Sequence, residues 1–362
     1  MFQAIMFSRL EARDFMKAIT YHNYGSPDVL QCEDLEKPVP GAGEVLIKVR
    51  AASVNPLDRG ELKGVPYIFR IVFGLRKPEV TQPGRPGVDV AGLVEAVGRN
   101  VTQFKPGDEV FGVCISNPQN SGVRVWLHHQ GSFAEYVCAP ESTLVLKPNN
   151  VTFEQAASLP VAALTALQGL RDKGHIQPGK KVLIHGAGGG VGTFAVQIAK
   201  SFGGDVTGVS STSNAEMIRS IGADRVIDYS DEDFTKSGQH YDMIFDCYAN
   251  HSLSEYRRVL HPRGIYVGIG PPVGLGGIGF LTRLIQMLLL SWMGSQKLLT
   301  FLAKPSKEDL TILRELVATG KVTPVIDRCY SLHEVPDAMR YLEEGHARGK
   351  VVITLDSEHC LG

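Results

Sequence analysis

The chain has 362 residues, enough for two domains with substantial hydrophobic cores. Hydrophobic residues make up 43% and charged residues 21%, an ordinary globular balance, and the formal net charge is -1. A nearly neutral chain has no global field to attract nucleic acid or an acidic membrane, so we expect neither as a partner. Six scattered cysteines without a C-x-x-C pair argue against a disulfide framework and fit a reducing, cytoplasmic compartment.

Residues 1–15 are interpreted as an N-terminal extension, because the stretch that opens at Met16 reads like a natural start. Two arginines in the extension are typical of a mitochondrial leader, but two acidic residues beside them argue against one. No long apolar signal core is present.

From residue 16 to about residue 150, short apolar runs alternate with turns rich in glycine and proline, which predicts a small β-rich domain. Residues 44–50 alternate apolar and polar side chains with a period of two, as in a half-buried strand. Residues 116–131 are polar and lack an apolar period, and we interpret them as a loop.

From Thr152 the apolar spacing becomes helical, and Pro160 is expected to divide residues 154–170 into two helices. Apolar strands and helices then alternate, which predicts a parallel sheet covered on both faces. The tail, residues 325–355, is β-rich again and is predicted to return to the first domain. Within the alternating region we expect strands at 205–210, 225–229, 241–247, 264–270 and 297–302, and helices at 215–221, 252–260 and 306–319.

The most informative stretch, residues 181–200, joins an apolar strand to a helix through clustered glycines. Its spacing is Ala187-x-Gly189-x-x-Gly192, with alanine where the commoner fingerprint has its first glycine. Glycines let the backbone approach a pyrophosphate closely, and a helix N-terminus offers free N–H groups and a positive dipole end. We therefore predict a dinucleotide site here; a glycine-rich hairpin, the alternative, would not explain the helical segment that follows.

Several further motifs give the chain a family resemblance over residues 16–355. They are Val54-Asn55-Pro56-Leu57-Asp58, Pro86-Gly87-Val88-Asp89-Val90-Ala91-Gly92, Lys105-Pro106-Gly107-Asp108-Glu109-Val110, Gly131-Ser132-Phe133-Ala134-Glu135-Tyr136, Leu164-Thr165-Ala166-Leu167 and Gly345-His346-Ala347-Arg348-Gly349-Lys350. With the glycine-rich turn they resemble the medium-chain dehydrogenase/reductase superfamily, in its zinc-free quinone oxidoreductase branch.

The resemblance implies an α/β fold with a doubly wound Rossmann sheet and a β-rich, GroES-like catalytic domain built from both ends of the chain. The expected divisions are an extension at 1–15, the GroES-like domain at 16–150, the Rossmann domain at 151–321, the return segment at 322–355 and a tail at 356–362.

The resemblance also implies that no catalytic metal is held. In zinc-dependent relatives a Cys, a His and a Cys bind the metal, and their places are taken here by Asn55, Val88 and about Val161. Zinc needs nitrogen or sulfur donors, which valine lacks. Leu57 takes the place of the hydroxyl that relays the alcohol proton. Without a Lewis acid or a proton relay, we expect little catalysis of alcohol oxidation, whereas reduction of an electron-poor acceptor depends less on either group.

Cofactor choice is expected at the end of the second Rossmann strand, where an Asp or Glu would bind the ribose 2′-OH and favour NAD. Residues 209–214, Val-Ser-Ser-Thr-Ser-Asn, contain no carboxylate. Small hydroxyl and amide groups leave room for a 2′-phosphate, so NADPH is expected, with NADH less favoured. Ser213 stands where related sequences often carry a basic residue, and the serines could instead cap the next helix.

The remaining cofactor contacts are implied by the resemblance. Thr165 resembles the residue under the nicotinamide, Asn55 the side chain beside nicotinamide and substrate, and Tyr229 the residue near the adenosine end. Asn55 is the candidate catalytic residue, and Asp58 has either a structural or a direct role. The full set of expected cofactor-binding residues is Asn55, Thr165, Gly188, Gly189, Gly190, Val191, Ser210, Ser211, Asn214, Tyr229, Ile269, Gly270, His346, Ala347 and Arg348.

The substrate is expected in a cleft between the domains, near Asn55, Tyr67 and a helix that contains Phe280. Apolar residues 67–73 either line its mouth or belong to the core, and apolar walls would suit a small, lipophilic, electron-poor acceptor. Residues 278–293 are too short for an integral membrane span; we expect a buried or pocket-lining helix, with peripheral membrane contact as the alternative. The histidines at 128 and 129 are interpreted as surface residues.

These observations predict a zinc-independent, NADPH-dependent oxidoreductase that transfers hydride to a quinone or an α,β-unsaturated carbonyl. One alternative is a zinc-free, NAD(P)-dependent dehydrogenase or reductase of another carbonyl. The other is a non-catalytic, cofactor-binding structural or interaction protein. A homodimer is expected from the resemblance, with the edge strand near residues 298–302 pairing with its mate.

Overall fold

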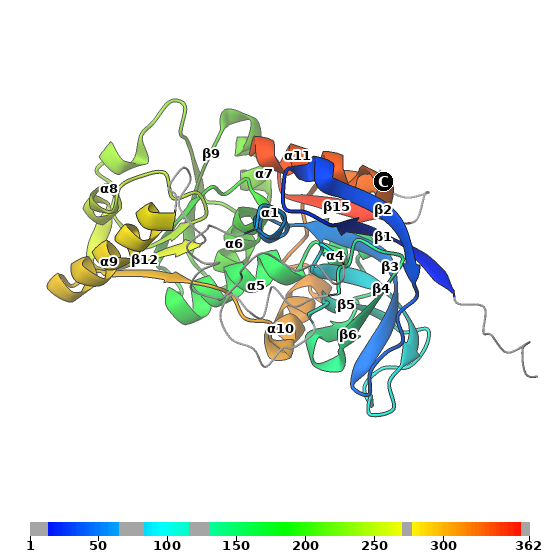
Figure 1. Ribbon diagram of the computed structural model, residues 1–362. Helices are drawn as coiled ribbons and strands as arrows, with labels where there is room; N and C mark the ends of the chain where they lie inside the picture. Colours follow the sequence, from blue (N-terminus) through cyan, green and yellow to red (C-terminus); the bar gives the residue numbers. More distant parts are fainter. Residues whose placement is uncertain (1–13, 65–82, 116–129, 270–276, 356–362) are drawn as a thin grey trace, which may run out of the picture.

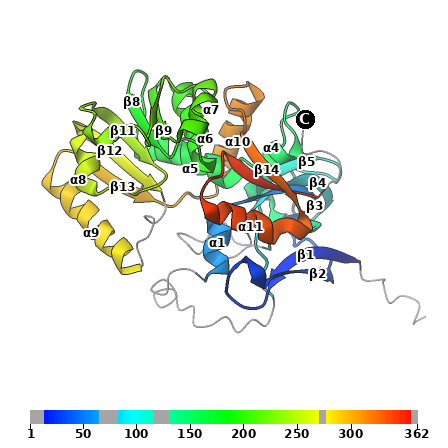
Figure 2. The same cartoon turned by 90° about the horizontal axis from the view of Figure 1, so that it is seen from above.

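The computed structural model describes residues 14–64, 83–115, 130–269 and 277–355. Two β-sheets lie side by side in these residues, each with its own helices (Figure 1). A separate hairpin of β1 (Phe15–Tyr21) and β2 (Leu30–Glu36) lies beside the second sheet, as Figure 2 also shows.

One sheet is parallel throughout, and all its strands come from the predicted Rossmann domain. Its neighbouring strands are all parallel, and the order of the strands reverses between β8 and β11. In such sheets ligands bind at the carboxyl ends of the strands beside the reversal. In spatial order the six strands are β10 (Arg225–Asp228), β9 (Asp205–Ser210), β8 (Lys181–His185), β11 (Tyr241–Asp246), β12 (Leu260–Ile269) and β13 (Lys297–Phe301).

Helices cover both faces of this sheet because successive side chains along a strand point to opposite faces. On β8, Val182 and Ile184 pack into one hydrophobic cluster, and Leu183 packs into another. The first cluster includes residues of α5 (Pro160–Gln168), α6 (Gly190–Ser201), α7 (Ala215–Ser220) and α10 (Lys307–Ala318). The second includes residues of α8 (Leu253–Arg258) and α9 (Gly277–Met293).

The other sheet joins the two ends of the chain. Strand β15 runs antiparallel to β3, and β14 runs parallel to β15, so the tail completes the sheet of the first domain. Helices α1 (Pro56–Leu62), α4 (Phe153–Ala157) and α11 (Val335–Glu344) belong to this half of the protein or to its border. In order the strands are β14 (Ile326–Ser331), β15 (Lys350–Thr354), β3 (Glu44–Val54), β4 (Asp89–Val97), β5 (Glu109–Val113) and β7 (Leu144–Leu146), with β6 (Tyr136–Pro140) pairing with β3.

The predicted fold class is confirmed, and so is the helix break, because Pro160 is the first residue of α5. Strand β3 differs from its prediction: it continues to Val54, and its second half is buried on both faces. Ala51 packs into the cluster that contains α4 residues, and Ala52 packs into the cluster that contains α11 residues. A period of two is lost where helices cover both faces.

Cys329 on β14 is disulfide-bonded, although no spacing motif in the sequence indicates this bond. Among the residues that the structure describes, the free thiols are Cys32, Cys114, Cys138 and Cys247.

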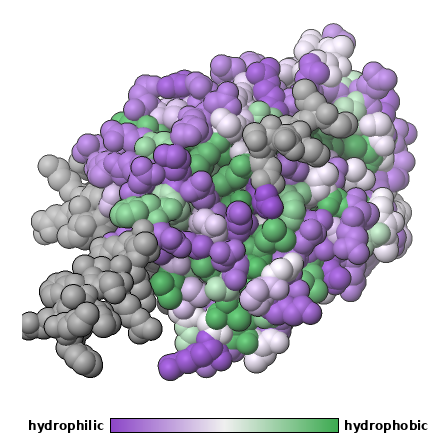
Figure 3. Space-filling model, turned by 90° about the vertical axis from the view of Figure 1, so that its right-hand side faces the viewer, coloured by the Kyte–Doolittle hydropathy of each residue, from purple (hydrophilic) through white to green (hydrophobic). Residues whose placement is uncertain are grey.

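The face on the side of β1 and β2 is mixed in character. In Figure 3 its hydrophobic groups form patches between hydrophilic ones. No helix among the residues described is both long and apolar enough to cross a bilayer.

Candidate active site

The glycine-rich turn joins β8 to α6 at the carboxyl edge of the parallel sheet. Gly189 is the N-cap of α6 and has no side chain to accept from the first-turn N–H groups. A Cβ at Gly192 would lie 2.1 Å from the carbonyl oxygen of Gly186, so helix and turn pack too closely for any other residue. A Cβ at Gly189 would meet only Gly186 O, at 3.6 Å, so the space over the N-cap is open. The turn therefore offers unused donors to an anion.

The loop after β9 lies against this turn. An added Cβ at Gly188 would be 2.5 Å from Nδ2 of Asn214, and the Asn214 Oδ1 atom is buried without a hydrogen-bond partner. A buried acceptor that lacks a donor is costly unless a ligand supplies one. The glycine turn and this unpaired oxygen fit a dinucleotide with its donor hydroxyls.

Ser210 ends β9 and Ser211 follows it, at the place where an Asp or Glu would favour NAD. Ser210 is buried and donates to the carbonyl of Ser211, whose own hydroxyl lies 3.0 Å from that of Ser213. Tyr229 is largely exposed, and its N–H donates to Ser210 O at 3.0 Å. The neighbouring strand, β10, does end in a carboxylate, Asp228. A hydrogen bond with the Thr212 hydroxyl holds the pKa of Asp228 below its usual value.

The return segment also reaches the turn. Gly349 N–H donates to the Gly188 carbonyl at 2.9 Å. Gly349 has φ +98°, and a Cβ there would lie 2.4 Å from Val325 O, so the chain needs glycine to make this approach. The predicted contacts just before it lie in the loop after α11, where His346 and Arg348 are exposed and Ala347 is half-buried.

Four other predicted contacts lie on three elements. Thr165 lies on α5 and donates its hydroxyl to Val161 O at 2.7 Å. Ile269 is the last residue of β12. Gly190 and Val191 open α6. Each of these positions is consistent with a cofactor that runs along the carboxyl edge of the sheet.

A buried polar cluster lies beside the turn, where three strands of the other sheet end. Asn55 and Lys350 are each 3% exposed, and Asp89 is fully buried. Lys350 Nζ donates to Asn55 Oδ1 at 2.7 Å and lies 3.6 Å from Asp89 Oδ2. Asp89 also accepts from Ser53 Oγ at 2.6 Å and from the Val161 N–H at 2.9 Å. Because Val161 belongs to α5, one carboxylate links the two halves of the protein.

Asp58 has a structural role in this cluster. Its Oδ2 accepts the N–H of Asn55 at 2.7 Å, and its Oδ1 accepts the N–H of Gly87 at 3.2 Å. It thereby caps the start of α1, where its own N–H donates to the Asn55 backbone carbonyl at 3.1 Å. Both carboxylate oxygens therefore hold backbone in place.

Two of the three positions that would hold a metal in zinc-dependent relatives are apolar here. Val88 belongs to a hydrophobic cluster, and Val161 and Leu57 pack against it. None of these side chains has an atom that could bind zinc or relay a proton. Asn55, the remaining position, has its amide bonded to Lys350 and Asp89.

A second buried pair lies at the base of the turn, on the last residues of β8 and β11. His185 Nδ1 lies 2.9 Å from Asp246 Oδ1, and Tyr266 donates its hydroxyl to Asp246 Oδ2 at 2.7 Å. Asp246 Oδ1 also accepts the N–H groups of Tyr248 and Ala249, which fixes the loop that follows β11. This pair supports the carboxyl edge of the parallel sheet at the glycine-rich turn.

The pH dependence of stability should report on this carboxylate. Burial acts to raise the pKa of Asp246, but its hydrogen bond and charge interaction with His185 outweigh burial, and the pKa falls to about 2. Because the pKa of Asp246 is lower in the folded than in the unfolded protein, its ionised form stabilises the fold at pH values above the unfolded pKa. This stabilisation is lost as the pH falls toward the folded pKa. We expect the stability advantage of wild type over Asp246→Asn to shrink by about 1 kcal/mol between pH 5 and pH 3. Urea unfolding at both pH values measures it, and an advantage that grows on acidification would contradict the assignment.

Some predicted site residues cannot be located. Tyr67 and Gly270 lie outside the described residues, as do His128 and His129. Phe280 lies on α9, where its side chain is not described.

The resemblance placed Lys350 in the returning segment expected to meet the cofactor, but it gave neither Lys350 nor Asp89 a role of its own. Each is a charged residue that opens a mainly apolar strand, and that signal could have found them.

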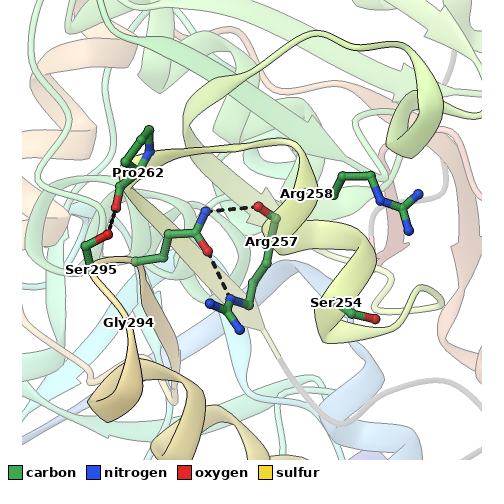
Figure 4. A pocket seen from close by; sticks show the side chains of 7 residues that line it. Ser254, Arg257, Arg258, Pro262, Gly294 and Ser295 are labelled. Atoms are coloured by element: carbon green, nitrogen blue, oxygen red, sulfur yellow. Dashed lines mark hydrogen bonds between the residues drawn. The ribbon is translucent and has the colours of Figure 1, made fainter.

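A surface pocket of about 500 Å³ lies at the opposite end of the parallel sheet, near the start of β12 (Figure 4). Arg257 Nε donates to Gln296 Oε1 at 3.0 Å, and Gln296 Nε2 donates back to Arg257 O at 2.9 Å. Ser295 turns its hydroxyl to the Pro262 carbonyl, whereas Arg258 points away from them. These bonds fasten the end of α9 to α8, and no residue of the glycine-rich turn lines the pocket.

A parallel sheet with a dinucleotide turn at its reversal point, joined to a GroES-like sheet, defines a two-domain NAD(P)-dependent oxidoreductase. Family models agree: "Alcohol dehydrogenase GroES-like domain" matches residues 41–149, and "Zinc-binding dehydrogenase" matches residues 221–353. The chain belongs to the medium-chain dehydrogenase/reductase superfamily, in its quinone oxidoreductase branch.

Three similar proteins illustrate the relationship. The 2-methylene-furan-3-one reductase of Solanum lycopersicum is 36% identical over 344 residues, which cover 93% of this chain and 79% of that protein. The chloroplastic quinone-oxidoreductase QR1 of Triphysaria versicolor is 33% identical over 356 residues, covering 94% and 99%. The structure of the quinone oxidoreductase from Coxiella burnetii matches with a TM-score of 0.78 and 30% identity, covering 95% and 100%.

Proposed function

We propose that this oxidoreductase uses NADPH, without a metal, to reduce a quinone or the C=C bond of an α,β-unsaturated carbonyl. The observation that carries the proposal is the apolar packing of Val88 and Val161 at two positions where zinc-dependent relatives have metal ligands, and of Leu57 where they have the proton relay. Relatives named as a quinone oxidoreductase, a 2-methylene-furan-3-one reductase and an alkenal/one oxidoreductase support the acceptor class.

The residues divide the work between binding and orientation. The turn at Gly188–Val191 would hold the pyrophosphate with its free N–H groups, and Asn214 would accept from a hydroxyl of the cofactor. Thr165 and Asn55 would border the nicotinamide. Bound NADPH supplies a hydride. A conjugated acceptor takes the hydride at its electron-poor carbon and a proton from water at the enolate, so no Lewis acid is required.

The decisive experiment is a turnover assay with product analysis. NADPH oxidation is followed at 340 nm with a panel of quinones, 2-alkenals and enones, and with saturated ketones and aldehydes as controls. With (4R)- and (4S)-deuterated NADPH, we expect one of the two to deliver deuterium to the β-carbon of the product ketone. An allylic alcohol as product would favour a reductase of another carbonyl, the first alternative. NADPH binding without turnover of any acceptor would favour a non-catalytic, cofactor-binding protein. Turnover abolished by a chelator and restored by zinc would contradict the metal-free proposal.

Cofactor choice can be tested at the serines that end β9. Ser211→Asp introduces a carboxylate beside the expected 2′-phosphate, so like-charge repulsion should weaken NADPH binding. We expect the Kd for NADPH to rise about tenfold or more, while the Kd for NADH stays the same or falls. Fluorescence titration with both cofactors measures the change.

Ser220→Asp is the matched control, because Ser220 is an exposed serine on the neighbouring helix α7. It adds the same charge away from the expected phosphate and should leave both affinities unchanged. Equal weakening of NADH and NADPH by Ser211→Asp would remove the argument for NADPH.

The proposal includes a homodimer. Strand β13 is at the edge of its sheet, and α9 beside it exposes an apolar stripe that soluble monomers rarely leave uncovered. The stripe consists of Leu281, Ile285, Leu288, Leu289 and Trp292. Light scattering should give a dimer for wild type and a monomer for Leu288→Glu, whereas Val39→Glu, an exposed apolar site elsewhere, should remain a dimer. A monomeric wild type that sediments with anionic vesicles would instead support peripheral membrane contact. We also propose a cytoplasmic location, which cell fractionation can test.

A further inference from the structure

The register of three strands brings Lys350 to Asn55. Val351 of β15 pairs with Val54 of β3, so Lys350 and Asn55 are the next residues across the same ladder. Ser53 of β3 pairs with Asp89 of β4 on the other side. A lysine, an amide and a carboxylate therefore meet at one end of the sheet, next to the dinucleotide turn.

The hydrogen bonds of Asn55 leave it one free site. Its Nδ2 donates to Asp89 Oδ2 at 2.9 Å and to the Ser53 carbonyl at 3.2 Å, which uses both amide protons. Its Oδ1 accepts from Lys350 and retains a second lone pair. A flipped amide would place its NH₂ group against the ammonium, so Lys350 fixes which end of the amide faces each neighbour. Asn55 can accept a hydrogen bond from a ligand, and it has no proton to donate.

Lys350 also touches the turn that would hold the pyrophosphate. A Cβ on Gly190 would lie 3.0 Å from Cδ of Lys350, and the preceding residue, Gly349, donates to Gly188 O. One side chain therefore runs from beneath the first turn of α6 to the amide of Asn55.

We propose that Lys350 is a positioning residue: acting through Asn55, it presents the amide oxygen as an acceptor for a donor at the nicotinamide end of the bound dinucleotide. That donor is an N–H of the nicotinamide carboxamide. The inference rests on the proposed function only for the identity of the dinucleotide as NADPH.

The charges around Lys350 agree with this role. Burial lowers the pKa of the ammonium, and the charges of Asp89 and Asp58 oppose that shift. The ammonium and the neutral amine both carry N–H groups, so Lys350 can donate to Asn55 Oδ1 in either form.

The test compares two ligands that differ only in the nicotinamide, NADPH and 2′-phospho-ADP-ribose, by calorimetric titration. For Lys350→Met we expect the Kd for NADPH to rise about tenfold, as for loss of a charge-assisted contact, and the Kd for the truncated ligand to stay within about twofold. A purely structural role would move both ligands together, and that result would overturn the proposal.

A double-mutant cycle tests whether Lys350 acts through Asn55. Lys350→Met should cost NADPH affinity in wild type and almost none in an Asn55→Ala background, because the mediator is already absent. Additive losses would overturn the proposal. If Lys350→Met does not fold, the two ligands are compared with Asn55→Ala alone, which removes the amide oxygen and should weaken NADPH but not the truncated ligand.

Lys147→Met is the matched control. Lys147 is another buried lysine, with its side chain 7% exposed, and it donates to the carbonyls of Pro148 and Val151 away from the turn. It should change neither affinity. Because the assay measures binding, absence of turnover with every acceptor would refute the proposed function while the ligand comparison still decides the role of Lys350. Failure of wild type to bind either ligand would refute both.

Discussion

Gly189→Val is expected to abolish dinucleotide binding while the protein stays folded. A side chain at this N-cap enters open space, since only one atom lies within 4 Å of its Cβ position, and the backbone there has φ −85° and ψ 175°, which valine adopts readily. That same space must admit the pyrophosphate if the turn binds it. We expect the Kd for NADPH to rise about 100-fold or more, measured by fluorescence titration.

Gly43→Val provides the control, because a Cβ at Gly43 also meets nothing within 4 Å but lies in the other domain. Its NADPH affinity should equal that of wild type. Gly192→Ala gives a useful contrast: its Cβ would clash with backbone at 2.1 Å, so it should lose stability as well as binding. NADPH affinity of Gly189→Val within twofold of wild type would mean that the cofactor does not lie over this turn.

Asp89→Leu is expected to have the largest effect on stability. The substitution leaves the Lys350 ammonium buried without its counter-charge, and it removes the acceptor for Ser53, Asn55 and the Val161 N–H. Removing one partner of a buried ion pair costs about 3–5 kcal/mol of unfolding free energy. Urea unfolding followed by circular dichroism measures the loss.

A second variant distinguishes the effect of the unpaired Lys350 charge on stability from the effect of lost packing. Adding Lys350→Met to Asp89→Leu removes the unpaired charge, so part of the stability should return. Asp34→Leu, which removes an exposed ion pair with Lys17, should change stability little. A double variant less stable than Asp89→Leu alone would show that the charge imbalance is not the cause.

Local patterns predicted the parallel sheet and its turn well. The helical and strand periods between Thr152 and Thr319 reflect elements that are buried in a regular way, so the sequence pattern and the structure coincide. Pro160 ends one helix and begins the next because its ring has no N–H to donate and limits the backbone. The spacing of Gly189 and Gly192 reports a backbone contact between residues close in sequence, which a motif can carry.

The buried cluster was not predictable in the same way. Lys350 and Asn55 are 295 residues apart, and Asp89 belongs to a third strand, so only strand register joins them. The same holds for His185 and Asp246, which meet because β8 and β11 are neighbours at the point where the strand order reverses. Sequence reasoning identified Asn55 as a site residue but not the partners that fix its amide.

The sequence by itself determined the class of fold, the dinucleotide turn and the absence of donor side chains at Val88 and Val161, because each depends on residue type or on short-range spacing. Only the tertiary structure decided that Asp58 holds backbone, that Asn55 has no free proton and that Lys350 lies between the turn and this amide. Those properties depend on which atoms are neighbours after folding, and hydrogen-bond partners hundreds of residues apart leave no periodic trace in one chain.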